Sequence, residues 1–436
     1  MVNSLTPFLE RLFRLSEHGT RVRTEVLAGL TTFVTMAYII FVNPQMMAAA
    51  GMDPGASFVA TCLASALACL FMGLYANWPV GLAPGMGMNA FFTYTVVGNM
   101  GYSWQVGLGA VFLSGVLFVI ISVTRLRGWM LNSIPMNLRF AMGCGVGLFI
   151  GFIGLQNGGL VVANPATILS LGDLTRPEPL LAGIGFLLIA GLGVRGVPGA
   201  IMLGILAVTA AGMLTGLVSW RGLVSAPPDM ASTFLQLDIA GALDVGMVSV
   251  VAAFLFVNLF DTTGTLMGVA YRAGLVDDQD NIRNLDRALK ADSSSSVVGA
   301  CLGCTPVTSY VESVAGIASG GRTGLSAVTV GVLFLLAVFF APLAQMVPEF
   351  ATSGALLFVA MLMLGGMRAL DWEDATELVP ALLTIVAIPL TFSIADGIAV
   401  GFITYVSVKL ASGRYRDISA GVWFLALIFL ARFVFI

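Results

Sequence analysis

The feature that most limits the fold of this 436-residue chain is its long stretches without charge. No Asp, Glu, Lys or Arg occurs in residues 54–124, although a helix needs only about 20 apolar residues to cross a bilayer. The chain is 58% hydrophobic and 10% charged, with a mean hydropathy of +0.97, whereas soluble domains carry about 25% charged residues. The sequence therefore predicts an all-α polytopic membrane protein with short loops and no soluble domain.

Apolar windows between charges, Gly and Pro predict about fourteen membrane segments. In the first half these are residues 26–41, 56–75, 79–97, 104–124, 140–155, 180–194 and 198–217. In the second half they are residues 246–270, 294–301, 305–318, 324–346, 353–366, 378–393 and 397–410. An odd number per half predicts two inverted repeats, an arrangement common among transporters. A further apolar segment, residues 418–434, contains Arg432 and fits a span, an interfacial position or packing at the edge.

The Lys and Arg residues predict the orientation in the membrane. With a cytoplasmic N-terminus, nearly all of them fall on the cytoplasmic side, and only Arg176 and Arg221 fall outside. Such a bias is the usual signature of orientation. We expect a multi-pass protein of the cell membrane, specifically a bacterial inner membrane. Residues 1–24 mix arginines with apolar side chains, which predicts a retained interfacial helix rather than a cleaved signal peptide.

Two carboxylates interrupt the apolar stretches of the second half. Asp261 is the only charged residue in 245–271, and Glu312 is the only one in 293–321. A charge at that depth costs about 2.5 kcal/mol or more, so it normally marks an ion or solute path. These two residues are the first candidates for the site. Each has a structural alternative, which is joining neighbouring helices for Asp261 and capping a broken helix for Glu312.

The third and tenth segments are predicted to be discontinuous. Both begin with Pro and Gly, in residues 78–87 and 303–306. Broken helices present half-helix N-termini and free backbone groups to a ligand near the membrane midplane. Asn89 follows the break in the third segment, as Glu312 does in the tenth, although an Asn near a helix start is often only a cap. Asp396 is predicted to cap the fourteenth segment.

Several motifs closely resemble the AzgA-like purine permeases, a branch of the nucleobase–cation symporters. These are residues 83–92 (APGMGMNAFF), 260–265 (FDTTGT), 308–313 (TSYVES), 320–324 (GGRTG) and 393–399 (SIADGIA). The similarity extends from about Arg11 to Arg416. It implies the uracil-permease fold, in which each broken segment begins with a short strand. It also implies a core domain (residues 24–127 and 245–346) and a gate domain (residues 136–217 and 352–411).

The resemblance also implies an activity and roles for the site residues. Members carry hypoxanthine, guanine or adenine, so it implies a secondary active importer driven by proton symport, with an elevator or rocking movement of the core against the gate. Asp261 and Glu312 would face the purine and carry the coupling proton, and Asn89 would add a polar contact. Relatives with this fold suggest a homodimer.

The remaining candidates are weaker. Thr265 stands one helical turn from Asp261, where uracil-transporting relatives have a histidine, and His18 is the only histidine in the chain. An imidazole relay in the membrane is therefore not expected. Tyr310 and Phe91 could stack on a purine, although most aromatic side chains in so apolar a chain only pack. The hydroxyls of residues 262, 263 and 265 could supply oxygen ligands, so a sodium site beside Asp261 is the alternative to proton coupling.

Two other functions fit the same residues less well. An anion transporter of the same fold would need a positive charge or bare helix N-termini at its site, whereas this chain presents two acids. A membrane hydrolase would need a nucleophile and base or metal ligands, and neither His-Glu-x-x-His nor Gly-x-Ser-x-Gly occurs. Cys301 and Cys304 have metal-ligand spacing but no second pair or nearby His. We expect no enzyme activity, cofactor, metal or nucleic-acid partner.

Overall fold

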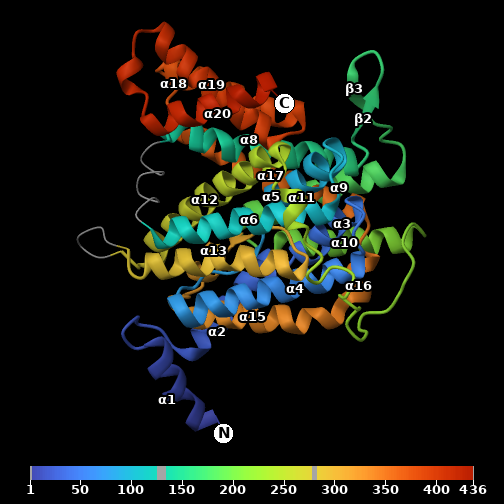
Figure 1. Ribbon diagram of the computed structural model, residues 1–436. Helices are drawn as coiled ribbons and strands as arrows, with labels where there is room; N and C mark the ends of the chain where they lie inside the picture. The colour runs from blue at the N-terminus through green and yellow to red at the C-terminus, as the bar shows by residue number, and fades with distance from the viewer. Residues whose placement is uncertain (1, 125–133, 277–281, 436) are drawn as a thin grey trace.

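Long apolar helices dominate the computed structural model, which describes residues 2–124, 134–276 and 282–435 (Figure 1). Within these ranges nine helices are long and apolar enough to cross a membrane, and three more apolar helices are shorter. The expected polytopic helical architecture is therefore confirmed. The number of fourteen spans and the inverted repeats stay predictions.

The helices of the first half are α1 (Val2–Phe13), α2 (Val22–Met36), α3 (Ile39–Ala49), α4 (Pro54–Phe71), α5 (Met86–Ala90), α6 (Trp104–Val123), α8 (Met136–Asn157), α9 (Pro177–Val194) and α10 (Ala200–Leu214), with π-helical turns η1 (Met72–Ala76) and η2 (Phe91–Asn99). Those of the second half are α11 (Ile239–Ala242), α12 (Val245–Ala273), α13 (Leu285–Leu302), α14 (Ser313–Ala318), α15 (Gly324–Ala337), α16 (Ala341–Met346), α17 (Glu349–Leu364), α18 (Ala375–Thr391), α19 (Ile394–Ala411) and α20 (Ala420–Phe435). Side-chain oxygens of Asp53, Ser103 and Thr323 accept hydrogen bonds from the first turns of α4, α6 and α15. Such caps fix where these helices begin.

The helices pack into two groups (Figure 1). Helices α2, α3, α4, α6, α12, α13 and α15 pack mainly among themselves, as do α8, α9, α10, α17, α18 and α19. Fewer contacts join the groups, among them those of α5 and α12 with α8 and of α3 with α17. Within the second group, an added Cβ on Gly147, Gly151 or Gly154 of α8 would lie 2.6–2.9 Å from side-chain atoms of α17. Small residues thus let these two helices approach closely.

Both expected broken segments begin with a short strand. Strand β1 (Leu82–Pro84) precedes α5, and β4 (Val307–Ser309) precedes α14. The strands pair antiparallel, with Leu82 opposite Ser309 and Pro84 opposite Val307. Both are buried. A second hairpin, β2 (Val161–Asn164) and β3 (Ile168–Leu171), lies in a connection expected to be a loop and extends from the bundle beside α9 (Figure 1).

The first predicted segment, residues 26–41, lies within one apolar span, Val22–Ala49, which has a turn at Ala37 and Tyr38 between α2 and α3. Two other expectations about the helices were wrong. The ninth was expected at residues 294–301, but α13 begins at Leu285 and so carries Asp292 into the bundle. Asp396 is not the cap of α19, because the Ser393 side chain accepts the hydrogen bond of the Asp396 amide. The apolar segment at residues 418–434 forms α20, which packs on α19.

A buried carboxylate joins α2 to the start of α15. Glu25 of α2 is fully buried. Its oxygens accept hydrogen bonds from the backbone amide of Arg322 (2.8 Å) and from the Ser326 hydroxyl (2.6 Å). The free amides and positive dipole end at a helix N-terminus favour an anion, so Glu25 stabilises this helix pair.

We predict that Glu25→Ala lowers the melting temperature of the detergent-solubilised protein. The substitution leaves buried amide and hydroxyl donors without their acceptor, at a cost of about 1–3 kcal/mol. Thermal unfolding followed by fluorescence would measure it, with the exposed Glu373→Ala as the matched control. An unchanged melting temperature in Glu25→Ala would contradict the role of this contact.

Candidate functional site

The strand pair holds the two broken segments together inside the bundle. Backbone hydrogen bonds extend the pairing at both ends, from Gly85 to Pro306 (2.9 Å) and from Tyr310 to Gly81 (3.0 Å). The Tyr310 hydroxyl donates to the carbonyl of Pro84 (2.5 Å). Buried backbone groups must find partners, and here each broken segment supplies those of the other.

Glu312 stands between β4 and α14. It occupies the N-cap position of α14 but makes no side-chain cap, so the capping alternative is wrong. Its carboxylate accepts a hydrogen bond from the Tyr38 hydroxyl at 2.7 Å, and Tyr38 lies where α2 gives way to α3. A carboxylate has about four acceptor positions, so this bond leaves acceptor capacity for a ligand. Tyr38 was not among the predicted site residues, because no Gly or Pro marks the turn between α2 and α3.

Asp261 lies near the middle of α12, and its charged neighbours are Asp292 and Glu312. Its side chain is exposed even though the bundle surrounds it. An added Cβ on Gly264 or Gly268, further along α12, would meet no atom within 4 Å, and the same holds for Gly143 of α8. Exposure and open space thus run from Asp261 toward the C-terminal end of α12, beside α8.

A third carboxylate, Asp292 of α13, was missed. It is fully buried and accepts hydrogen bonds from the hydroxyls of Thr262 (2.7 Å) and Ser309 (2.6 Å). The Thr262 oxygen lies 2.9 Å from that of Thr308. Asp292 therefore joins β4 to α12 at Thr262, the residue that follows Asp261. In the sequence it directly precedes residues 293–321, in which Glu312 is the only charged residue, so it read as the end of a polar connection.

Asn89 lies inside α5 and is fully buried. The N-cap of α5 is Gly85, so the expectation that Asn89 acts only as a cap is wrong. Its side-chain oxygen accepts a hydrogen bond from the Thr305 hydroxyl at 2.5 Å. Its amide nitrogen has no hydrogen-bond partner among the residues that the structure describes. A buried donor without a partner costs about 1–3 kcal/mol, which a ligand acceptor would recover.

The other candidates have different surroundings. Thr265 is half-buried on α12, one turn from Asp261. The buried ring of Phe91 packs edge-on against Phe254 of α12, with centroids 5.0 Å apart. The Tyr310 ring is buried next to β1. Cys304 accepts a hydrogen bond from Asn43 through its sulfur (3.6 Å).

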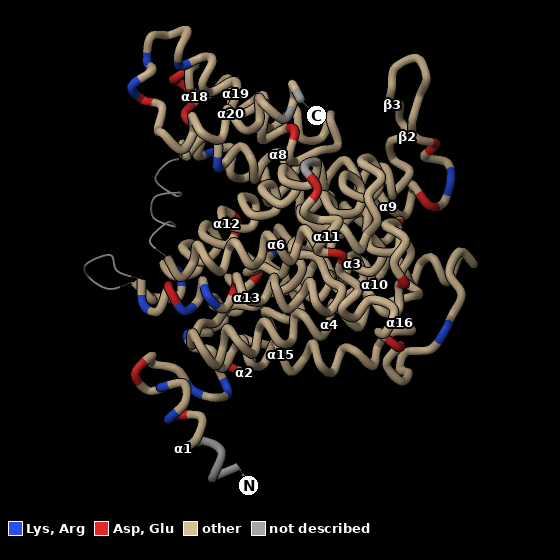
Figure 2. Tube along the Cα trace, in the orientation of Figure 1, with Lys and Arg blue, Asp and Glu red and all other residues tan. Residues whose placement is uncertain are grey.

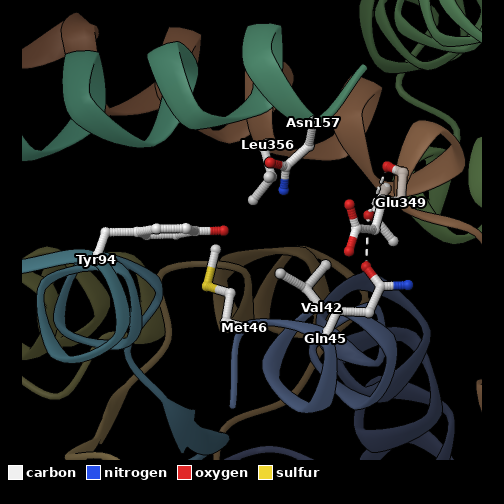
Figure 3. A pocket seen from close by; sticks show the side chains of 8 residues that line it. Val42, Gln45, Met46, Tyr94, Asn157, Glu349 and Leu356 are labelled. Atoms are coloured by element: carbon white, nitrogen blue, oxygen red, sulfur yellow. Dashed lines mark hydrogen bonds between the residues drawn. The ribbon is translucent and has the colours of Figure 1, made fainter. Parts of the chain in front are cut away.

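A polar seam closes the space between the two helix groups at α3 and α17. The Gln45 amide donates to the carbonyl of Val347 (2.8 Å) and accepts from the Thr352 hydroxyl (2.7 Å). Tyr94 of η2 and Asn157 of α8 line the same small pocket. Figure 3 shows these side chains around a small pocket that also contains the exposed Glu349. We call these contacts the α3–α17 seam.

Comparison with known proteins places the chain in a family. Residues 23–400 match the model described as "Permease family". Adenine permease AdeP of Escherichia coli is 49% identical over 98% of this chain and 96% of its own length, and guanine/hypoxanthine permease PbuG of Bacillus subtilis is 42% identical over 98% and 100%.

Solved structures show the same fold at low identity. The transmembrane domain of the cyanobacterial bicarbonate transporter BicA has a TM-score of 0.66 at 17% identity, covering 86% of this chain and 97% of that one. The structure of SLC26A9 has a TM-score of 0.64 at 10% identity, covering 90% and 66%. The chain therefore belongs to the permease family, as its AzgA-like motifs indicated, and is a membrane transporter rather than an enzyme.

Proposed function

We propose that the protein imports purine nucleobases (hypoxanthine, guanine or adenine) by proton symport across the cell membrane. The observation that carries this proposal is the meeting of Asp261 and Glu312 at the paired broken segments. The relatives named as adenine and guanine/hypoxanthine permeases support the substrate class. We place the substrate against Asp261, Glu312 and Asn89, with Thr265, Tyr310 and Phe91 at its margins.

The chemistry of the site suits a purine. Its ring and exocyclic N–H groups are donors that carboxylates accept, and such charge-assisted bonds are about twice as strong as neutral ones. The buried amide of Asn89 supplies a donor for a ring nitrogen or carbonyl oxygen of the base. An anion at the same place would face Asp261 and Glu312, so the anion-transporter alternative has only the shared fold in its favour.

Proton coupling is supported by the mutual proximity of three carboxylates, of which Asp292 is fully buried. Asp261, Asp292 and Glu312 lie together, and charge away from water is costly unless it is neutralised. A proton bound at Asp261 or Glu312 together with the purine would lower the charge that crosses the membrane. Sodium is the alternative coupling ion, because the Thr262 hydroxyl donates to Asp292 and the Thr263 hydroxyl to the carbonyl of Leu259 (2.6 Å), and both oxygens keep lone pairs that could ligate a cation.

Alternating access by movement of the core against the gate is supported by the packing. The two helix groups match the proposed domains, and they meet at the closed α3–α17 seam and at the open face of α12. Figure 2 shows Lys and Arg gathered at the end of the bundle near α1 and the start of α13. With that end in the cytoplasm, the site would open inward and be closed outward. The choice between elevator and rocking, and the homodimer, stay predictions.

We predict that the protein reconstituted in liposomes accumulates adenine, hypoxanthine or guanine, but not uracil, when a pH gradient is imposed in sodium-free buffer. Radiolabelled uptake would be compared with that under a sodium gradient at equal pH. Accumulation only with sodium would overturn proton coupling and leave the purine assignment standing. No purine uptake in either condition, with uptake of bicarbonate or sulfate, would favour the anion transporter.

Substitutions of the two carboxylates are expected to impair different steps of transport. Glu312→Ala should weaken purine binding about 5- to 150-fold, because the purine donors lose an acceptor worth about 1–3 kcal/mol. Asp261→Asn keeps the shape and most of the hydrogen-bonding capacity but loses the titratable group, so accumulation against a gradient should fail more severely than binding. Equilibrium binding and gradient-driven uptake would be measured on the same preparations.

The exposed Glu373→Ala is again the control and should behave as wild type in both assays. Wild-type affinity in Glu312→Ala would remove this residue from the site. Normal pH-driven accumulation by Asp261→Asn would move the coupling role to Glu312 or Asp292.

The α3–α17 seam should have to open during transport. In the variant Gln45→Cys with Thr352→Cys, whose native side chains touch at 2.7 Å, a short thiol cross-linker should stop purine exchange, and a reductant that cleaves the linker should restore it. The two single-cysteine variants, treated alike, control for the native cysteines. Full exchange by the cross-linked protein would show that this seam stays closed throughout the cycle.

A further inference from the structure

A chain of uncharged polar side chains runs from α4 to α5 behind the site. It passes from the Ser57 carbonyl through Thr61, Asn43 and Thr305 to Asn89. The side chains of these last four residues are all completely buried. The contacts are Thr61 to the Ser57 carbonyl (2.6 Å), Asn43 to Thr61 (2.8 Å) and Thr305 to Asn89 (2.5 Å). None of these side chains carries a charge.

The Ser57 carbonyl fixes which group donates and which accepts in each hydrogen bond of this series. A carbonyl can only accept, so the single hydroxyl proton of Thr61 is used there and the Thr61 oxygen accepts from Asn43. Asn43 must then present its NH₂ group to Thr61 and its oxygen to Thr305. Thr305 therefore receives no donor from Asn43, and its own proton is free to go to one of two side-chain oxygens.

The distances decide where the Thr305 proton goes. The Asn89 oxygen lies 2.5 Å from the Thr305 hydroxyl, and the Asn43 oxygen lies 3.5 Å from it. The shorter distance is typical of O–H···O bonds, which span about 2.5–3.0 Å, and is too short for N–H···O bonds, which span about 2.7–3.2 Å. Asn89 therefore turns its oxygen to Thr305, and its NH₂ group is the one left without a partner.

We propose that Thr305 is a positioning residue that fixes the Asn89 amide as a hydrogen-bond donor to the transported base. This inference rests on the proposed function. If the Asn89 side chain were flipped, its oxygen would add a third acceptor to the carboxylates of Asp261 and Glu312. In the orientation held by Thr305, its NH₂ group adds a donor instead. The site then requires a ligand with an acceptor close to its N–H donors. Hypoxanthine and guanine offer O6 beside N1–H, and adenine offers N1 beside its amino group.

The test compares ligands that lack a single acceptor. Purified protein would bind radiolabelled adenine in competition with adenine and its 1-deaza, 3-deaza and 7-deaza analogues, in each of which one ring nitrogen is replaced by C–H. Hypoxanthine replaces adenine as the labelled ligand if it binds more tightly. In the wild type, one analogue should bind about tenfold more weakly than the parent base, the loss expected for an unmade buried hydrogen bond.

That discrimination should shrink to about twofold or less in Asn89→Ala and Thr305→Val, because neither holds a donor in place. Thr305→Ser keeps the hydroxyl and should preserve it. Thr209→Val is the matched control, since the buried Thr209 hydroxyl bonds only to Ile205 of its own helix α10. It should leave every affinity at the wild-type value.

Undiminished discrimination in Thr305→Val, or its loss in Thr305→Ser, would overturn the positioning role. Equal wild-type affinity for all the deaza analogues would also overturn it, because Asn89 would then donate to no ring nitrogen. Failure of the wild type to bind any purine would instead overturn the proposed function. The two failures are therefore distinguishable.

Discussion

The structure depends on how backbone amides are satisfied where two helices break inside an apolar bundle. Away from water, an unpaired N–H or C=O costs several kcal/mol, about as much as a lost hydrogen bond in an apolar medium. Strands β1 and β4 meet this demand by pairing with each other. The pairing has a second effect, because it fixes the start of α5 against the start of α14. Asn89 and Glu312 follow the two strands and are therefore held in register by the same hydrogen bonds.

The polar groups on the two sides of the strand pair differ in kind. On the side of β4 and α12, Asp292 accepts hydrogen bonds from the hydroxyls of Thr262 and Ser309 and so joins β4 to α12 at the residue that follows Asp261. Behind α5, the chain from Ser57 to Thr305 contains no ionisable group. The side with Asp292 contains a group that can gain or lose a proton, whereas the side behind α5 contains only neutral hydrogen-bonding groups.

The candidate site residues have clearer signals in the sequence than the residues that surround them. Asp261 and Glu312 stand alone in apolar stretches, and Asn89 follows a Pro-Gly break, so each has a local signal. Tyr38 and Asp292 have none. Tyr38 is linked to the site by its hydrogen bond to Glu312, which is far away in the chain. Asp292 adjoins a charged connection, and only the helical path of α13 reveals that it is buried.

The same reasoning explains the error at Asp396 and the absence of any prediction for the α3–α17 seam. An Asp at a helix start is a good cap, but Ser393 stands three residues earlier, and its hydroxyl reaches the Asp396 amide at 3.1 Å. The seam joins residues from four elements, and Gln45 and Thr352 are ordinary polar residues near helix ends. The proposed opening of the seam requires contacts of only modest strength, which neutral hydrogen bonds of about 0.5–1.5 kcal/mol each provide. Such contacts leave no sequence pattern, since any pair of short polar side chains at that place would serve.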